Sequence, residues 1–141
     1  MVELKILKGE ASIPEYKSNG SACFDLKASQ SIVLKKKAVT QVPTGLKVEF
    51  PNDHVLLIFS RSGLASRGFI MANSVGVIDS DYRGEIKILL WNTTEEDFLI
   101  SKDDRIAQGL LLKIDKTTFN VVSELSSTYR GEGGFGSTGL K

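Results

Sequence analysis

Apolar and polar residues alternate with a period of two over several short stretches of this chain. The alternation covers residues 2–6 (VELKI), 46–50 (LKVEF) and 86–88 (IKI), and a further apolar position, Ile114, follows Lys113. A period of two is typical of a strand with one buried and one solvated face. Turn-forming sequences such as PTG and PND separate these stretches at short intervals. The pattern predicts an all-β fold, either a sandwich or a barrel.

Two segments depart from this alternation. Residues 60–68 (SRSGLASRG) are small, polar and glycine-bearing, which predicts a loop with at most one helical turn. Residues 126–139 include RGEGGFGSTG, in which five of ten residues are glycine. Glycine loses much conformational entropy on ordering, so this tail is predicted to be mobile until a ligand orders it. We therefore expect one β-rich domain over residues 1–125 and a flexible arm over residues 126–141.

Length, charge and the rare residue types exclude several classes of function. The 141 residues suit one domain with its own core, and 18 Lys and Arg against 17 Asp and Glu give a net charge near zero. This balance lacks the cationic excess that drives non-specific binding to nucleic acid or anionic membranes, so no direct nucleic-acid binding is expected. The single cysteine, Cys23, rules out an intrachain disulfide and a cysteine-rich zinc site. The single histidine, His54, leaves no histidine pair for a metal.

Membrane and targeting segments are not expected. The longest apolar runs, such as residues 55–59 (VLLIF), fall far short of the roughly 20 residues that span a bilayer. The first residues, MVELKILKGE, alternate charged with apolar groups, which is unlike a signal peptide. A lone thiol fits a reducing compartment, so the expected location is cytoplasmic or nuclear.

The glycine-rich tail is the first of three clusters with candidate chemistry. RGEGGFGSTG contains G-x-G-x-x-G, but a dinucleotide site needs a strand before it and a helix after it, and only a few residues follow. The tail also lacks the lysine of a P-loop. Its backbone amides, the Arg130 guanidinium and the hydroxyls of Ser137 and Thr138 still suit a polyphosphate. A disordered C-terminus is the alternative that these residues alone leave open.

Two further clusters lie in the body of the chain. The sequence RSG at 61–63 supplies a bidentate cation, a hydroxyl and a backbone amide at one turn, although an ordinary loop explains it more simply. Residues 76–85 (GVIDSDYRGE) join two apolar stretches and are predicted to form the tip of a hairpin. Asp79 there could act as a general base toward water, and the Tyr82 ring could pack against a sugar. The alternative for Asp79 and Asp81 is the capping of a turn through Asx hydrogen bonds.

Together with two further stretches, these clusters resemble the five ordered motifs of the homotrimeric dUTPase family (deoxyuridine 5′-triphosphate nucleotidohydrolases). The motifs are residues 21–26 (SACFDL), 61–65 (RSGLA), 76–84 (GVIDSDYRG), 104–108 (DRIAQ) and 130–139 (RGEGGFGSTG). They occur in family order across nearly the whole chain, which is far more specific than any one of them. The resemblance implies a distorted jelly-roll or β-clip-like barrel, assembled as a homotrimer with three active sites at subunit interfaces. It also implies a C-terminal arm that reaches a neighbouring subunit and closes over the site.

The activity that this resemblance implies is hydrolysis of dUTP to dUMP and pyrophosphate with Mg²⁺, which keeps uracil out of DNA and supplies dUMP for dTMP synthesis. Asp79 matches the family's general base, which activates the water that attacks the α-phosphorus. Asp25 matches the carboxylate that helps to hold the water shell of the metal. The metal would bind mainly through phosphate oxygens and water, in keeping with a chain that lacks a His and Cys ligand set.

Substrate contacts follow from the same resemblance. The phosphate-binding residues that it implies are Arg61, Ser62, Gly63, Gln108, Arg130, Ser137 and Thr138, the last three at the γ-phosphate. The residues that it implies around uracil and deoxyribose are Asn73, Gly76, Val77, Ile78, Tyr82, Phe135 and Gly136. The main chain of residues 73–82 would bind the uracil. Tyr82 would lie under the deoxyribose, where a 2′-hydroxyl would clash, and Phe135 would cover the base.

Five positions depart from the family pattern. Cys23 and Phe24 replace the usual Gly and Tyr of the first motif, Phe59 and Ser60 replace Ala and Pro, and Gly109 replaces a larger apolar residue. Phenylalanine keeps the ring but loses the hydroxyl, and a glycine inside a strand is expected to loosen that strand. None of these changes removes a proposed catalytic group.

Two other functions stay open on the sequence. A dCTP deaminase, or a bifunctional relative, shares the fold superfamily, but this chain is short for one and its third motif is of the dUTPase type. A nucleotide-gated regulatory protein could use the same scaffold to contact a partner. Release of ammonia from dCTP would identify a deaminase, whereas Asp79 and the complete tail favour retained hydrolysis.

Overall fold

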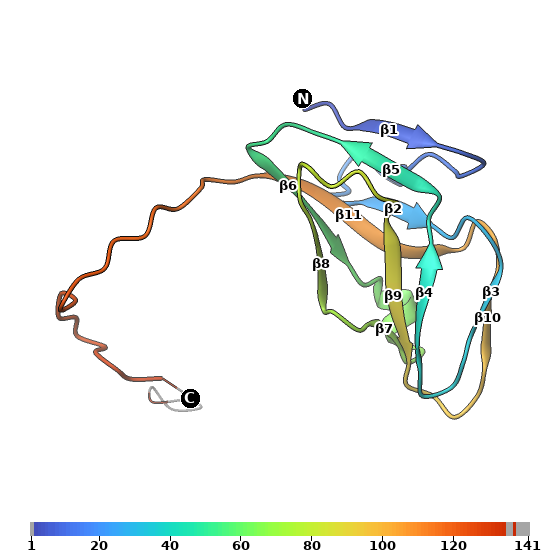
Figure 1. The fold of residues 1–141 in the computed structure, drawn as a ribbon. Helices are drawn as coiled ribbons and strands as arrows, with labels where there is room; N and C mark the ends of the chain where they lie inside the picture. Colours follow the sequence, from blue (N-terminus) through green and yellow to red (C-terminus); the bar gives the residue numbers. More distant parts are fainter. Residues whose placement is uncertain (1, 135–136, 138–141) are drawn as a thin grey trace.

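The chain folds into antiparallel strands with one turn of helix, in a computed structural model that describes residues 2–134 and 137 (Figure 1). The elements in chain order are β1 (Lys5–Lys8), β2 (Phe24–Lys27), β3 (Ile32–Leu34), β4 (Val39–Pro43), β5 (Leu46–Glu49), β6 (His54–Phe59), α1 (Ser62–Ala65), β7 (Phe69–Met71), β8 (Val75–Ile78), β9 (Lys87–Asn92), β10 (Phe98–Ile100) and β11 (Arg105–Lys113). No helix in the described part of the chain is long and apolar enough to cross a membrane. The predicted all-β class is confirmed.

Four small sheets make up the body within the described residues. The largest has the strand order β2-β11-β6-β8, and a three-stranded sheet has the order β4-β9-β7. Two strand pairs, β1-β5 and β3-β10, complete the set. β11 pairs with β2 along one edge and with β6 along the other. The last strand of the chain therefore lies between two strands that are much earlier in the sequence.

The alternation along the strands decides which side chains enter the core. In β5, Leu46 and Val48 are buried while Lys47 and Glu49 are exposed. β9 repeats the pattern, with three buried side chains between more exposed ones. The least exposed apolar side chains come from all parts of the body: Leu26, Leu34, Val42, Leu46, Leu56, Ile58, Ile86, Ile88, Leu90, Ile100 and Ile106. Removal of this apolar surface from water is the main favourable contribution to folding.

The segment 76–85 is not the tip of a hairpin, so that prediction is wrong. β8 pairs with β6, whereas β9 pairs with β4 and β7. The chain therefore crosses from one sheet to another between Ile78 and Lys87. Alternation predicted β9 and an apolar stretch marked β8, but each strand pairs with partners elsewhere in the chain, which the local pattern does not specify.

The prediction of a loop with one helical turn at residues 60–68 is confirmed. α1 is four residues long, and the Leu64 and Ala65 amides both donate to the Arg61 carbonyl oxygen, at 3.1 and 3.0 Å. Gly68 ends the loop with a φ of +86°, a left-handed conformation that glycine adopts without steric cost. The Gly68 carbonyl oxygen accepts a bond of 2.9 Å from the Thr93 amide, which anchors the loop beside the end of β9.

The C-terminal segment leaves the body of the protein after β11 ends at Lys113 (Figure 1). Residues 114–134 contain no strand or helix. Their apolar side chains lie in the open, and Phe119, Val121 and Leu125 are 87–97% exposed. These side chains therefore take no part in the core of their own chain.

Candidate active site

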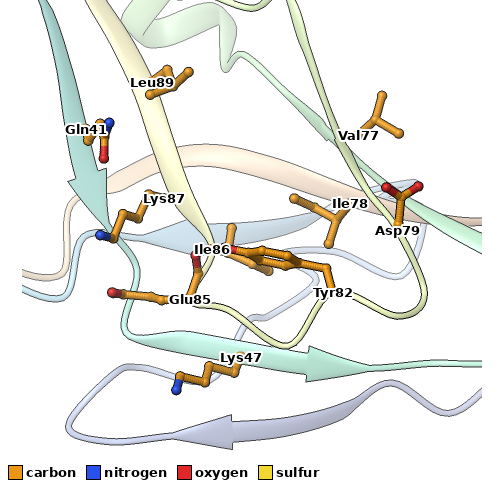
Figure 2. Close-up of a pocket in the computed structure, with 10 residues that line it drawn as sticks. All are labelled: Gln41, Lys47, Val77, Ile78, Asp79, Tyr82, Glu85, Ile86, Lys87 and Leu89. Carbon is orange, nitrogen blue, oxygen red and sulfur yellow. Dashed lines mark hydrogen bonds between the residues drawn. The ribbon is translucent and has the colours of Figure 1, made fainter.

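Asp79 lies on a tight turn directly after β8. The Tyr82 amide donates to the Asp79 carbonyl oxygen at 3.1 Å, which closes a four-residue turn. Among the described residues no donor is bonded to the carboxylate of Asp79 or Asp81, so Asx capping does not account for them. The Asp79 carboxylate is exposed and borders an open pocket of about 670 Å³, here called the turn pocket (Figure 2). A carboxylate in this position is available to accept a proton from water.

The Tyr82 ring lies between Asp79 and Glu85 in the turn pocket (Figure 2). Its hydroxyl donates to the Glu85 carbonyl oxygen at 3.1 Å. The ring covers Gly84 so closely that a Cβ atom there would overlap with it. Gly84 thus permits this ring position, a role that sequence reasoning missed, although the sequence YRG did place a glycine near the tyrosine. Tyr82 is 43% exposed, which leaves one face for a ligand.

β8 is an edge strand, because within the described residues only β6 pairs with it. Alternate N–H and C=O groups on its free edge have no strand partner in this chain. Gly76 packs against β6, where a Cβ atom on it would stand 3.0 Å from the Ile58 Cβ atom. Val77 faces outward, and Asn73 is exposed in the turn from β7. The strand therefore presents backbone donors and acceptors at fixed spacing beside Asp79.

A second pocket, of about 320 Å³, gathers residues from β2, α1 and β11 and is here called the arginine pocket. The carboxylate of Asp25 is buried there between two guanidinium groups, with Oδ1 3.0 Å from Arg61 Nε and Oδ2 3.1 Å from Arg105 Nη1. Arg61 also donates from Nη1 to the Arg105 carbonyl oxygen at 3.1 Å. Lys17 also lines the pocket, but its Nζ atom lies 2.6 Å from Glu15 Oε2, so that carboxylate balances its charge. Cations that outnumber the carboxylate make this pocket suited to an anion.

Backbone groups at the start of α1 line the same pocket. The helical bonds begin at the Leu64 amide, so the amides of Ser62 and Gly63 precede the first of them. A Cβ atom on Gly63 would meet nothing within 4 Å, which shows that the space beside it is open. Gln108 donates from Nε2 to the Ser60 carbonyl oxygen at 2.9 Å. The fold thus brings the predicted residues of the first, second and fourth motifs into one pocket.

The two pockets lie at opposite ends of β6. Ile78, which precedes Asp79, is opposite Leu56, whereas Arg61 follows the other end of the strand at Phe59. Six residues of extended chain separate the position beside Asp79 from Arg61, a span of roughly 20 Å. Such a span is much longer than the distance from an α- to a γ-phosphorus. The structure therefore does not bring all predicted site residues of one chain together.

Metal-binding groups are sparse in the part of the chain that the structure describes. It contains no cluster of three or more His, Cys, Asp or Glu side chains. Each oxygen of Asp25 contacts one arginine and keeps a further lone pair, which can accept a hydrogen bond from a metal-bound water. Cys23 also lines the arginine pocket, but burial raises the pKa of its thiol, which favours the neutral thiol over a metal-binding thiolate. The donor set fits a cation that arrives already bound to a ligand.

The described residues of the glycine-rich tail line neither pocket of their own chain. Three of its predicted contact residues lie outside the described residues: Phe135, Gly136 and Thr138. Arg130 is exposed and donates from Nε to the Gly133 carbonyl oxygen at 2.9 Å. The Ser137 amide donates to the Gly134 carbonyl oxygen at 3.0 Å. Contact between these residues and a ligand in either pocket requires another position of the arm or another chain.

Comparisons with known proteins agree with the motif resemblance. A deoxyuridine 5′-triphosphate nucleotidohydrolase of Treponema denticola is 47% identical over 137 residues, covering 95% of both chains. One of Rickettsia prowazekii is 45% identical over 146 residues, covering 99% of both chains. The solved structure of a mutant dUTPase of Staphylococcus bacteriophage 80alpha with dUpNHpp has a TM-score of 0.89 at 26% identity and covers 99% of both chains. A sequence model of the dUTPase family matches residues 9–139, and with it the chain is shown to belong to the dUTPase family.

Proposed function

We propose that this protein is a dUTP nucleotidohydrolase (dUTP diphosphatase) that cleaves dUTP to dUMP and pyrophosphate. The observation that carries the proposal is the exposed carboxylate of Asp79, placed beside an edge strand and a half-exposed tyrosine ring. Membership of the dUTPase family and relatives of matching length named for this activity support the choice of substrate. Such an enzyme keeps uracil out of DNA and supplies dUMP for dTMP synthesis.

Recognition of the base falls to the main chain of β8 and its flanking turns, from Asn73 to Tyr82. Donors and acceptors fixed along a strand edge match the hydrogen-bonding edge of uracil, and cytosine presents a different pattern to the same groups. Tyr82 also supplies a flat surface for the deoxyribose. Its hydroxyl is bound to Glu85, so the ring is held in place before a ligand arrives. A sugar with a 2′-hydroxyl would meet that ring.

The chemical step assigned to Asp79 is the activation of water. A water molecule bound to the carboxylate attacks the α-phosphorus and forms the new P–O bond, while its proton passes to Asp79. The bond from the α-phosphorus to the bridging oxygen breaks, and pyrophosphate leaves. Phosphoryl transfer of this kind depends mainly on positioning and on charge stabilisation, which the cationic lining of the arginine pocket supplies.

A triphosphate with its α-phosphorus at Asp79 does not extend to Arg61 of the same chain, because roughly 20 Å of extended backbone along β6 separates the two positions. We propose a homotrimer in which each site takes the turn pocket of one subunit and the arginine pocket of another, the assembly that the family resemblance implies. Exposed apolar side chains on the sheets supply surface for such an interface. They include the cross-strand neighbours Val39 and Trp91 and the cross-strand neighbours Val33 and Leu99.

The C-terminal segment is proposed to complete the site on a neighbouring subunit. Its exposed apolar side chains at Phe119, Val121 and Leu125 have no partner surface on their own chain among the described residues. Docking of this stretch would bring the following tail over the bound triphosphate. There Arg130, Ser137 and Thr138 would contact the γ-phosphate, and Phe135 with Gly136 would cover the base. A cover of this kind excludes bulk water from the reaction.

Magnesium is proposed to enter the site on the triphosphate. The described residues hold no acidic cluster that could bind the ion alone, and phosphate oxygens and water are the ligands that Mg²⁺ prefers. When bound, the ion neutralises charge that develops on the phosphates. Asp25 is the residue proposed to accept a hydrogen bond from its water shell. A location in the cytoplasm or nucleus stays a prediction from the lone thiol.

An assay of pyrophosphate release from dUTP, dCTP, dTTP and UTP, with Mg²⁺ and with EDTA, tests the proposed function. We expect turnover of dUTP alone, and only with Mg²⁺. Ammonia released from dCTP would show a deaminase instead. Absence of turnover with every nucleotide would contradict the proposal and favour a regulatory role for the scaffold.

Replacement of the proposed base tests the role of Asp79. Asp79→Asn keeps the shape of the side chain but cannot take the proton, so kcat should fall by about two to four orders of magnitude. The affinity for the non-hydrolysable analogue dUpNHpp, measured by calorimetry, should change little. Asp81→Asn is the matched control, because Asp81 is exposed on the same turn. Equal effects of the two substitutions would contradict the assignment.

A further inference from the structure

We propose that Asp25 is a positioning residue that holds Arg61 and Arg105 together as a paired clamp for the phosphate chain, and that Arg105 is itself a phosphate-binding residue. The proposal rests on the proposed function for the identity of the phosphate compound. It goes beyond the motif resemblance, which gives Arg105 no role and relates Asp25 to the water shell of a metal.

The clamp is visible in its three contacts. Asp25 Oδ1 lies 3.0 Å from Arg61 Nε, and Asp25 Oδ2 lies 3.1 Å from Arg105 Nη1. Arg61 Nη1 donates to the Arg105 carbonyl oxygen at 3.1 Å, so the first arginine is fixed to the backbone that carries the second. These contacts use only a part of the N–H donors of each guanidinium. The remaining donors are available to a ligand in the pocket.

Burial and charge explain why the carboxylate is needed. The Asp25 side chain is only 11% exposed, and two guanidinium groups this close repel each other unless an anion lies between them. Arg105 is the more open of the pair, with a side chain 44% exposed against 23% for Arg61. Glu15 balances the charge of Lys17 in the same lining at 2.6 Å, so the two arginines and Asp25 set the charge of the pocket. The pocket keeps a positive excess after Asp25 is counted, which suits a polyphosphate.

Measurement of pyrophosphate binding in EDTA distinguishes a positioning role of Asp25 from two other roles: competition with the anionic ligand and contact with metal-bound water. Asp25→Asn removes a negative charge, so a carboxylate that merely competed with the ligand would give tighter binding when replaced. A carboxylate that acted only through metal-bound water would give no change without metal. A positioning residue gives weaker binding, because the released arginines lose the geometry that matches phosphate. Only the third result agrees with the proposal.

The experiment is calorimetric titration of inorganic pyrophosphate into the full-length protein in EDTA. We expect Arg105→Gln and Asp25→Asn each to weaken binding by about tenfold or more. Arg105→Lys should recover only a part of the loss, because an ammonium group cannot span the carboxylate and a phosphate. The controls are Lys35→Gln and Asp97→Asn, which break an exposed ion pair of 2.7 Å outside the pocket. Both controls should bind pyrophosphate like the unmodified protein.

The double variant tests whether Asp25 acts through Arg105. Independent contributions would multiply to about a hundredfold loss, whereas a carboxylate that works through the arginine gives a smaller combined loss. The proposal would be overturned if the losses of the two single variants multiplied in the double variant. It would also be overturned if Asp25→Asn bound pyrophosphate as tightly as the unmodified protein, or more tightly. If Asp25→Asn lowers the thermal unfolding midpoint so far that it does not fold, Arg105→Gln decides, since Arg105 is the more exposed partner. The proposal would then be overturned if Arg105→Gln bound pyrophosphate as tightly as the control variants do.

The same measurement keeps this proposal distinct from the proposed function. Pyrophosphate binding by the unmodified protein does not require hydrolysis of dUTP. A protein that binds pyrophosphate through the clamp and leaves dUTP intact would contradict the enzyme assignment alone. If the protein cleaves dUTP but Arg105→Gln changes neither the affinity for pyrophosphate nor the KM for dUTP, the clamp alone would be contradicted.

Discussion

The position of Tyr82 depends on neighbours that need not touch a ligand. The Glu85 carbonyl oxygen accepts its hydroxyl, and Gly84 leaves the space that the ring occupies. Arg83 donates to the Ser80 carbonyl oxygen at 2.7 Å and braces the same turn. The sequence indicated an aromatic ring near a carboxylate, since both occur within four residues of each other. The need for a glycine beneath that ring follows from the geometry of the turn alone.

Gly84→Ala should loosen the selection of the sugar without unfolding the protein. The added Cβ atom would overlap with the Tyr82 ring and displace it from the deoxyribose. We expect the ratio of kcat/KM for dUTP over UTP to fall by about tenfold, equivalent to about 1.4 kcal/mol of discrimination. Tyr82→Phe removes only the bond to Glu85 and should have a smaller effect. An unchanged ratio with Gly84→Ala, at an unchanged unfolding midpoint, would refute this role of the ring.

Strands β2 and β11 show how two departures from the family pattern compensate for each other. Phe24 and Gly109 are direct cross-strand neighbours, and the Phe24 ring lies over Gly109. A Cβ atom on Gly109 would stand 2.5 Å from the ring, so a larger residue there excludes this packing. Tyr16 adds an edge-to-face contact, with ring centroids 5.8 Å apart. The expectation that the glycine loosens its strand overlooked the aromatic ring that covers it.

Gly109→Ala should therefore destabilise the protein, by about 1–3 kcal/mol in the free energy of unfolding. The added methyl group pushes the Phe24 ring out of its place. Combination with Phe24→Leu should recover a part of this loss, because the smaller side chain leaves room for the methyl group. Denaturant titrations at one fixed protein concentration give the values. Gly9→Ala is the control, because a Cβ atom there meets nothing within 4 Å. The argument would be contradicted if Gly109→Ala lowered the free energy of unfolding no more than Gly9→Ala does.

Strands were more predictable than their partners. Period-two alternation predicted β5 to within one residue and overlapped the first residues of β1 and β9, because burial of one sheet face is a local property of the sequence. The pairing of β8 with β6, in place of β9, could not be predicted in the same way. A strand of four residues such as β8 carries little pattern of its own, and its partner is chosen by the packing of the whole body.

At the scale of the whole molecule, the sequence predicted the members of the candidate site better than their arrangement. Five motifs in order predicted which residues belong to the candidate site, including Asp79 and Arg61. Their separation along β6 follows only from the register of β6 and β8. The predicted residues of one chain thus lie in two separate pockets, which under the proposed assembly would each complete a site with a different subunit. Any test of the site must for this reason be a test of the assembly as well.

Mixing of inactive variants tests whether two chains share each site. Asp79→Asn damages the turn pocket, and Arg61→Gln damages the arginine pocket, so each variant alone should be nearly inactive. Equal amounts of the two variants are denatured, mixed and refolded, so that they assemble at random. Each site then has an even chance of an intact turn pocket and an even chance of an intact arginine pocket, so about a quarter of the sites in a cyclic assembly should be complete. Turnover of dUTP by the mixture should rise to about a quarter of the rate of the unmodified protein.

A mixture of Arg61→Gln with Gln108→Ala is the control, and it should stay inactive because both changes damage the arginine pocket. If the variants refold and assemble normally but neither mixture is active, each site is built within one chain. The turn that carries Asp79 would then have to move toward Arg61 to close the span along β6.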